Sequence, residues 1–548
     1  MSLDRLAAGA RPYLLLLILT FAVALPGIAA IPPLDRDESR FAVASREMIE
    51  TGDYVTVRFQ DELRAKKPPL ANWLQAGAAE LTGARDAIWP YRLPSVLGIL
   101  VAVLATFHFG ASLVGRRGAL LAAAILAVTP LVASEAHQAK TDALLLGCVA
   151  LAQGALARFY LAARKGEARP GRGLALLFWL AQAAAILTKG PILPMVSVLT
   201  IAALLVADRK TPRPWGWLAG LRPLSGIALV IVLAAPWAIL VTLATRGQFI
   251  AQAVGHDLLG KVAGGQEAHA APPATYLLSA TATLWPGIVF IVPGLVRAWR
   301  ARGEPVVRFC LAWAIPAWIV FEATPTKLPH YILPCVPALA LLAGLALAGA
   351  EPVWSRRWVL VYALIAALVG VAVAGAAIAA PLAVGSGLAW VSFPCAVAAL
   401  AAGIMPASAL LKGRPPRAAT IAVLAAAVTL AFLFGGVMPA LDKLWVSPRV
   451  AALAPVGAPA VITSDREPSL IFLLGTRTRL ADAAGAARFL LDTPGGVAVV
   501  DTADKDKFLS PLRAAGKEPA ALGAVAGLNY SRGKPVDVTV WTLGPDAR

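Results

Sequence analysis

The sequence is poor in charge and in cysteine. Only 15% of its 548 residues are charged, against about 25% in soluble domains. The chain has four cysteines, all within apolar stretches and none in a CxxC spacing: Cys148, Cys310, Cys335 and Cys395. This pattern predicts structural thiols and argues against a disulfide framework or a cysteine metal site.

The sequence is correspondingly rich in apolar residues. They make up 59% of the chain, where soluble domains have about 45–50%, and the mean hydropathy is +0.72. These values indicate a mainly α-helical, polytopic membrane protein. The net charge of +18 lies in short loops between apolar runs, where membrane topology accounts for it. We therefore expect contact with anionic lipid headgroups and no nucleic-acid partner.

Apolar runs near the spanning length of about 20 residues recur through the first 440 residues, and we count about thirteen of them. The first, 13–31, follows Arg5 and Arg11; we interpret it as an uncleaved helix, although a cleaved signal peptide has a similar pattern. The others lie at 91–110, 119–133, 140–161, 174–188, 191–207, 224–245, 276–296, 309–322, 331–349, 359–380, 389–411 and 418–440. The runs 119–133, 174–188 and 309–322 are the shortest.

Alternate connections between these runs are basic, as at Arg116-Arg117, 164–172, 208–222, 297–308, Arg356-Arg357 and 412–417. The positive-inside rule places these loops and the amino terminus in the cytoplasm. The opposite set faces outward: 32–88, 134–139, 188–190, 246–275, 323–330, 381–388 and the tail from 441. We therefore divide the chain into a transmembrane domain, 1–440, which includes the outer loop 32–88, and an outer domain, 441–548.

The tail has the pattern of a soluble α/β domain. Short apolar segments at 460–463, 496–500 and 536–542 predict strands, and 484–491 predicts a helix. The tail contains no nucleotide-binding glycine loop, and we favour a lid or packing module over a catalytic unit.

Carboxylates gather at the start of the first outer loop. Asp35, Asp37 and Glu38 precede a segment, 38–51, whose apolar residues recur at helical spacing up to Gly52. This predicts an amphipathic helix in the membrane interface. Asp37 is at the position of a helix cap, which is the structural alternative to a catalytic role. Three acidic side chains exceed what one cap needs, and this favours a functional site.

Cations follow on the same loop. Lys66 and Lys67 precede Pro68-Pro69, which hold the chain out of a helix. A solvated turn or contact with lipid headgroups is one interpretation, and a clamp for a phosphate is the other.

Further polar residues lie in the other outward loops. Several have a structural alternative, such as anchoring a helix at the membrane interface or capping it; for Lys189 we favour the anchor. These residues are Glu135, His137, Lys140 and Asp142; Lys189; His256, Asp257, Lys261 and His269; and Lys327, His330 and Tyr331.

Several motifs resemble those of one enzyme superfamily. They are Asp37-Glu38-Ser39-Arg40-Phe41-Ala42, Arg46-Glu47-Met48, Gly52-Asp53, Lys67-Pro68-Pro69-Leu70, Tyr91-Arg92-Leu93-Pro94 and 327–334. In order and spacing they are similar to the polyprenyl-phosphate-dependent GT-C glycosyltransferases, the aminoarabinose transferases and family 39-like protein mannosyltransferases. The resemblance covers residues 10–345, and the tail only in general layout.

The resemblance implies roles for individual residues. Asp37, with Glu38 beside it, would be the catalytic acidic group. Lys67, Lys261 and Tyr331 would hold the donor phosphate, supported by Arg40 and Lys66, while His256, Lys327 and His330 would line the site. Aminoarabinose transferases carry a glutamate immediately before the lysine of the Lys-Pro-Pro motif, where this chain has Lys66. A divalent metal that His256 and this glutamate would share thus loses one ligand here, which argues against metal dependence and leaves His256 as the candidate ligand.

The function implied is transfer of a hexosyl, pentosyl or amino sugar from a polyprenyl-phosphate donor, such as an undecaprenyl-phosphate sugar. The acceptor would be lipid A or another envelope lipid, glycan or protein, at the periplasmic face of a bacterial inner membrane. Two other classes fit the composition: a lipid or solute transporter or flippase, and a structural membrane protein with a sensor tail. Few charges lie within the predicted helices, and no inverted repeat is evident, which argues against a coupled carrier.

The predicted topology can be tested with a reporter. A reporter enzyme that is active only in the periplasm should be active when it is fused after residue 440. A reporter that is active only in the cytoplasm should be active when it is fused in the basic loop 208–222. The opposite pattern would contradict the orientation derived from the basic loops.

Overall fold

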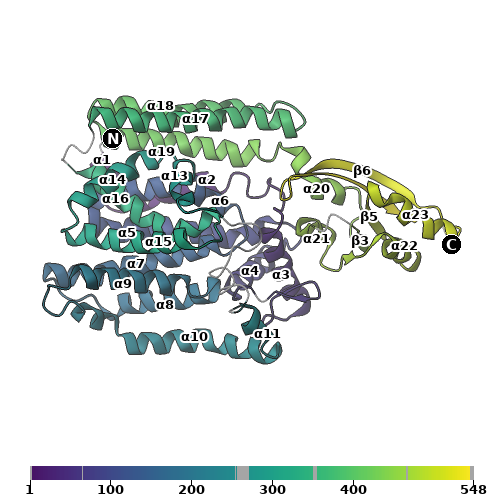
Figure 1. The fold of residues 1–548 in the computed structure, drawn as a ribbon, viewed down its shortest axis with the longest axis horizontal. Coiled ribbons are helices and arrows are strands. Elements are labelled where there is room, and N and C mark those ends of the chain that lie inside the picture. The colour runs from purple at the N-terminus through teal and green to yellow at the C-terminus, as the bar shows by residue number, and fades with distance from the viewer. Residues whose placement is uncertain are drawn as a thin grey trace.

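The computed structural model describes residues 3–64, 66–253, 255, 271–349, 355–463 and 467–543. Figure 1 shows a bundle of long helices with a small α/β domain beyond one end. The amino terminus lies at the other end of the bundle. The helices α3 and α4 lie at the junction between the bundle and the α/β domain, so the loop 32–88 and the tail share one end, as the alternation of basic loops predicts.

The bundle is built from the apolar runs of the sequence. Its longer helices are α2 (Arg11–Ala24), α5 (Trp89–Ala127), α7 (Asp142–Lys165), α8 (Arg172–Lys189), α9 (Ile192–Ala207), α10 (Pro223–Ala244), α14 (Ile288–Arg300), α15 (Pro305–Ala323), α16 (Val336–Ala348), α17 (Arg356–Val384), α18 (Ser392–Leu411) and α19 (Pro415–Phe432). Short helices connect them: α1 (Leu3–Ala7), α6 (Pro130–Ala136), η1 (Gly216–Leu221), α11 (Gln248–Ile250), α13 (Thr275–Thr283), η3 (Pro329–Cys335) and η4 (Leu433–Val437).

Within the described residues, eight helical segments are long and apolar enough to cross a membrane, and α2 and α9 are shorter apolar helices. The total of thirteen spans stays a prediction. One helix, α5, contains two of the predicted runs. The helical conformation of α5 is interrupted at Gly115, which has the non-helical angles φ 75° and ψ 158°. A Cβ added at Gly110 would touch Ala119, so the chain reverses at Gly115 beside Arg116. The predicted gap between 91–110 and 119–133 is this turn.

Close contact between α5 and α7 positions the loop that leads into α7. A Cβ on Gly98 of α5 would collide with the carbonyl group of Ala143, so only glycine allows this approach. Such contacts between small residues are common where helices pack within membranes. The hydroxyl of Ser95, one turn earlier on α5, donates to the carbonyl of Gln138 at 2.6 Å. The loop 138–141 is thereby fixed against α5.

The outer loop contains α3 (Asp37–Thr51), the hairpin of β1 (Arg58–Phe59) and β2 (Glu62–Leu63), and α4 (Leu70–Thr82). The predicted helix 38–51 is confirmed, and it ends at Gly52 with a left-handed φ of 72°. One face of α3 packs against α4. Ser45 donates to Gln75 of α4 at 2.8 Å and accepts from Asn72 at 3.0 Å, all three side chains being fully buried.

The tail forms one five-stranded sheet in the order β4-β3-β5-β7-β6. Strand β3 is parallel to β4 and β5, whereas β7 is antiparallel to β5 and β6. The strands are β3 (Ala460–Ile462), β4 (Arg479–Leu480), β5 (Val497–Asp501), β6 (Ala520–Asn529) and β7 (Lys534–Thr542), and the helices are α20 (Val446–Ala451), α21 (Pro468–Leu474), α22 (Ala483–Asp492) and α23 (Lys505–Ala514), with 3-10 turns η5 (Asp442–Leu444) and η6 (Thr502–Asp504). The segments predicted at 460–463, 484–491, 496–500 and 536–542 correspond to β3, α22, β5 and β7.

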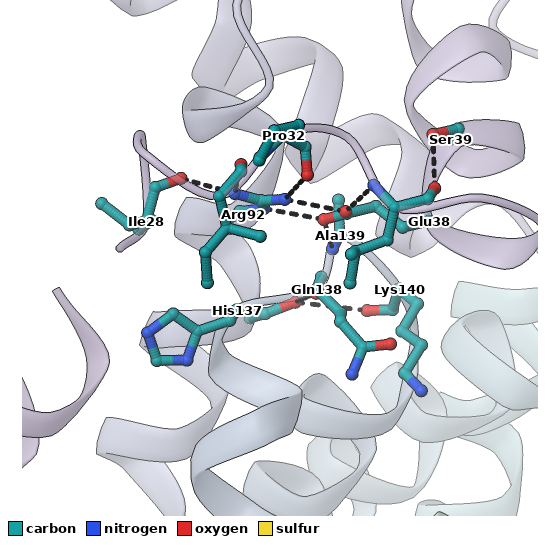
Figure 2. A network of polar contacts seen from close by, with 12 residues as sticks. Ile28, Pro32, Glu38, Ser39, Arg92, His137, Gln138, Ala139 and Lys140 are labelled. Carbon is teal, nitrogen blue, oxygen red and sulfur yellow. Dashed lines mark hydrogen bonds and ion pairs between the residues drawn. The ribbon is translucent and has the colours of Figure 1, made fainter. Parts of the chain in front are cut away.

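A buried ion pair ties α3 to the bundle (Figure 2). Arg92 of α5 is 0% exposed and Glu38 of α3 is 1% exposed. Arg92 donates to both carboxylate oxygens of Glu38 at 2.8 Å, and to the carbonyls of Ile28, Ile31 and Pro32 at 2.7, 2.7 and 3.0 Å. All five guanidinium N–H groups are thus used.

Glu38 also accepts from two backbone amides, those of Leu34 and Ala139, each at 2.8 Å. The carboxylate is therefore enclosed by protein donors, and a substrate cannot reach it. This corrects the prediction that Glu38 belongs to the catalytic group. Its role is to join the first outer loop to the loop 138–141.

Breaking this pair should destabilise the protein. Glu38→Gln removes the charge that compensates Arg92, and loss of one partner of a buried pair costs about 3–5 kcal/mol. We expect a clear fall in the melting temperature of the detergent-solubilised protein.

The matched control is Glu80→Gln on α4. Glu80 pairs with Arg85 at 2.7 Å, with both side chains 40–52% exposed, and such pairs contribute about 0–1 kcal/mol. Equal melting temperatures for the two variants would contradict the structural role of Glu38.

Candidate functional site

A cavity of about 320 Å³ opens at the end of the bundle that carries α3 and α4. Its walls come from the start of α7, the turn between α8 and α9, the end of α15, the start of η3 and the segment Lys66–Pro68. Most of the lining is apolar, from Leu145, Leu146, Pro191, Ile192, Met195, Phe249, Val320, Phe321, Leu333 and Pro334; the polar lining is Lys66, Lys67, Asp142, Lys189, Thr324, His330 and Tyr331. The cavity is thus amphipathic, with several cations on its wall.

Two buried ion pairs lie at the polar side of this cavity. Lys189 pairs with Asp142, and Lys140 pairs with Glu135 at 2.9 Å. The ring of His330 lies between them: its Nε2 is 3.8 Å from the carboxylate of Asp142 and its Nδ1 is 4.0 Å from that of Glu135. All five side chains are at most 14% exposed. Charges so poorly solvated interact strongly with any ion that enters.

Burial shifts the pKa values of the groups at this end of the bundle. It raises the pKa of Glu135 to about 7, in spite of the ion pair with Lys140. Burial lowers the pKa of Lys140, but Glu135 and Asp142 outweigh it, and the net pKa is raised. Lys140 therefore stays positive while Glu135 can change its charge near neutral pH.

Asp37 lies close to this cluster, at the first position of α3. Its side chain is 60% exposed, and the guanidinium of Arg64 is 4.0 Å away. Arg64 stacks on the ring of Phe41, 4.1 Å from its centroid. The charge of Asp37 also acts on Lys140. The N-cap position is Arg36, without a side-chain cap bond, so the capping interpretation of Asp37 is wrong.

The structure brings several predicted residues to the cavity. Lys66, Lys67, His330 and Tyr331 line it. Lys67 interacts electrostatically with His330, and the amine of Lys189 lies 5.3 Å from the ring centroid of Tyr331. The carboxylate of Asp37 and the amine of Lys67 thus act on neighbouring members of the same cluster.

Other predicted residues lie elsewhere. Arg40 is half-buried on α3, one turn beyond Asp37. Lys327 is 8% exposed and donates to the carbonyl of Thr324 at 2.7 Å, so it braces the chain beside the cavity instead of lining it. His256 and Lys261 lie outside the described residues, as do Asp257 and His269.

Two interpretations of residues in the outward turns need correction, those of Lys189 and Asp142, and the structure assigns a role to His137. Lys189 is no simple anchor, because it lines the cavity and pairs with Asp142. Asp142 lacks a capping bond, since Thr141 is at the N-cap. His137 is structural: its ring nitrogens are each 2.8 Å from a carbonyl, those of Ala133 and Pro26. Glu135, Lys140, Asp142 and Lys189 were already candidates in the sequence, but the sequence does not show which of them pair.

In the described part of the chain no three His, Cys, Asp or Glu side chains come together as metal ligands. His256 lies outside that part, so the absence of a metal cofactor stays a prediction.

A larger cavity of about 690 Å³ lies between α3, the β1–β2 hairpin and the edge strand β4. Its wall includes Glu47, whose carboxylate accepts from the amide of Gln60 at 2.7 Å. Burial raises the pKa of Glu47 to about 7. Fewer apolar side chains line this cavity than the first, its described lining contains no lysine, and residues 476–480 of the C-terminal domain form part of its wall.

The chain is similar in sequence to known transferases over little more than half of its length. The family described as dolichyl-phosphate-mannose-protein mannosyltransferase matches residues 66–239. The undecaprenyl phosphate-alpha-4-amino-4-deoxy-L-arabinose arabinosyl transferase of Aeromonas hydrophila is 31% identical over 321 residues, which are 57% of this chain and 56% of that protein. The protein of the same name from Edwardsiella ictaluri is 27% identical over 60% of this chain and 57% of its own length. The similarity thus spans little more than half of these relatives.

Solved structures extend the likeness to nearly the whole chain. The structure of ArnT from Cupriavidus metallidurans bound to undecaprenyl phosphate has a TM-score of 0.74 and 21% identity, covering 97% of this chain and 98% of that one. The oligosaccharyltransferase of Archaeoglobus fulgidus in the apo form has a TM-score of 0.52 and 11% identity, covering 90% and 69%.

The chain therefore has the GT-C fold of membrane glycosyltransferases. Within that class it is related in sequence to the aminoarabinose transferases of the ArnT type. The resemblance predicted from the motifs is confirmed.

The raised pKa values predict a titration near neutral pH. Exposed carboxylates lose their protons near pH 4, so between about pH 6 and about pH 8 few carboxylic acids remain to ionise. Infrared difference spectra over that range should show the carboxylic C=O band disappearing as pH rises through about 7, the value for both Glu135 and Glu47. Each of Glu135→Gln and Glu47→Gln should remove part of that signal. A wild-type spectrum without the band would contradict both shifts.

Proposed function

We propose that this protein transfers a sugar from a polyprenyl-phosphate donor to an acceptor at the periplasmic face of a bacterial inner membrane. The observation that carries the proposal is the amphipathic cavity, which is apolar along most of its wall and lined by Lys66, Lys67 and Lys189. Asp37 is close enough to the adjoining Lys140 to act on its charge. A donor of this class has a matching division into an isoprenoid chain and a charged phosphate.

The cavity accounts for donor binding. Apolar side chains from α7, α9, α15 and η3 receive the isoprenoid next to the headgroup. Lys66 and Lys67 hold the phosphate from the outer loop, and Lys189 and the hydroxyl of Tyr331 approach it from the bundle. At an effective dielectric near 20, one cation at about 4 Å from a phosphate charge gives about 4 kcal/mol of Coulomb energy before desolvation.

The same cations assist the reaction. The bond between the anomeric carbon and the phosphate oxygen breaks, its electron pair stays on the lipid phosphate, and the acceptor oxygen bonds to the sugar. Negative charge on the phosphate and positive character on the sugar both grow toward the transition state. Fixed lysines stabilise the first of these more in the transition state than in the ground state, which lowers the barrier.

Asp37 fits the role of the catalytic carboxylate. An acceptor brings its hydroxyl from outside, and Asp37 is an exposed acidic group close to the cluster, whereas Glu135 and Asp142 are already paired with lysines. Asp37 takes the proton that the acceptor hydroxyl loses. The guanidinium of Arg64, 4.0 Å away, helps to orient the carboxylate.

The relatives suggest the first substrates to test. An undecaprenyl-phosphate aminoarabinose is the donor that their names describe, and lipid A is the first acceptor to try. We propose no metal for the reaction, since Lys66 occupies the position of the expected glutamate. A transporter or flippase was the alternative from composition. The relatives reported above are transferases, which favours transfer.

The test is sugar transfer by purified protein in liposomes. Asp37→Asn removes the base and should lower kcat by about 100-fold or more. Lys67→Ala removes one charged contact to the phosphate and should weaken binding of undecaprenyl phosphate by about 10- to 100-fold.

Matched controls lie on α23 of the C-terminal domain. Asp506→Asn and Lys507→Ala make the same changes at exposed positions and should leave both quantities as in wild type. Full activity in Asp37→Asn would contradict the assignment of the base. Movement of lipid across the bilayer by wild type, with no glycosyl product, would instead support the flippase.

A further inference from the structure

The C-terminal domain makes direct contact with the turn that precedes Asp37. The backbone amide of Asp35 donates to the hydroxyl of Tyr530 at 2.7 Å, and the guanidinium of Arg36 donates to the carbonyl of Ser531 at 2.7 Å. The hydroxyl of Ser469 donates to the carboxylate of Asp35. Two separate parts of the domain, the β6–β7 turn and the start of α21, therefore hold two consecutive residues of the loop.

The backbone at Arg36 needs such support. Its angles are φ 64° and ψ −108°, outside the regions that a residue with a side chain normally adopts. A conformation of this kind persists only where the surroundings impose it. Arg36 directly precedes Asp37, so its backbone angles set the direction in which α3 starts and where the Asp37 carboxylate points.

The residues that grip the turn are themselves well fixed. Tyr530 packs edge-on against Trp445, with ring centroids 5.9 Å apart. Ser469 shares a hydrogen bond of 2.6 Å with Ser447, and both are buried. The buried carboxylate of Glu467 accepts from Asn529 at 2.8 Å and from Ser531 at 3.2 Å, which joins α21 to the β6–β7 turn. The contact surface is therefore a preformed polar network.

The domain also holds the far half of α3. Arg46 donates to the carbonyl of Phe472 at 3.3 Å, and Thr476 donates to Glu50. After the helix, Gln60 donates to the carbonyl of Thr478 at 2.6 Å. With α4 and the Glu38–Arg92 pair on its other side, α3 is fixed along its whole length and cannot rotate about its axis.

We propose that the C-terminal domain is a positioning element for the reaction, with Tyr530, Ser531 and Ser469 holding the Asp35–Arg36 turn so that the Asp37 carboxylate faces the acceptor hydroxyl. The role of Asp37 in this proposal rests on the function proposed above. The domain contributes no group that reacts; it fixes the direction of one that does. This gives the tail a more specific task than the lid or packing module expected from its sequence.

The test uses Tyr530→Phe in the full-length protein. This change removes one hydroxyl and keeps the ring against Trp445. Amide hydrogen exchange at Asp35 and Arg36 should become about 3- to 10-fold faster, since one hydrogen bond of modest net strength is lost. In liposomes, kcat for sugar transfer should fall about 10-fold because the base is misplaced, while affinity for undecaprenyl phosphate stays within about twofold of wild type. Ser469→Ala should act in the same direction.

Two controls separate positioning from general damage. Ser510→Ala repeats the serine change at an exposed site on α23, and Tyr362→Phe repeats the tyrosine change on α17. Both should match wild type in exchange at the turn and in kcat.

Each outcome decides a separate point. Unchanged exchange in Tyr530→Phe would overturn the grip on the turn, and faster exchange with an unaltered kcat would overturn the positioning role. Weaker donor binding with unaltered kcat would also count against it. A wild-type protein that transfers no sugar would refute the proposed function, while the exchange measurement would still decide whether the domain holds the turn.

Discussion

The buried pair between Glu38 and Arg92 is the contact on which the arrangement of the site depends. It joins the segment from the end of α2 to the start of α3 with two parts of the chain that are distant from it in sequence, α5 and the loop 138–141. Asp37 adjoins Glu38 in sequence. Lys140 adjoins Ala139, whose backbone amide donates a hydrogen bond to the Glu38 carboxylate. The enclosed Glu38 carboxylate thus brings Asp37, its neighbour in sequence, close to the buried Lys140. Figure 2 shows Glu38 beside Ala139 and Lys140. A charge without water around it must find all its partners in the protein, which makes this arrangement specific.

The cavity beside this contact carries a second constraint. Lys140 and Lys189 are each paired with a carboxylate inside the bundle. Lys66 and Lys67 line the same cavity from the outer loop, on a segment that Pro68 and Pro69 hold out of a helix. In the function proposed above, an anionic headgroup enters between them and meets cations that are fixed in advance. Electrostatic stabilisation is most effective when the charges need no reorganisation as the reaction proceeds.

The position of the C-terminal domain follows from the same loop. The bundle holds α3 through Glu38, and the domain holds it through Asp35, Arg36 and Glu50. Because these contacts lie on different sides of α3, they fix its rotation as well as its place. Rotation of a helix changes the direction of its first side chain, so in the mechanism proposed above a domain without reacting groups controls where the Asp37 carboxylate points.

The sequence by itself determined the membrane class, most of the helices, the α/β character of the tail and the two ends of the site, Asp37 and Lys66-Lys67. These follow from local properties such as apolar run length, periodicity and loop charge. Tertiary structure alone decided that Glu38 is enclosed while Asp37 is exposed, that Lys189 and Asp142 pair across two helices, and that Lys327 turns to Thr324. Adjacent or similar residues differ here because burial and partners are set by segments up to several hundred residues away. No local pattern contains that information.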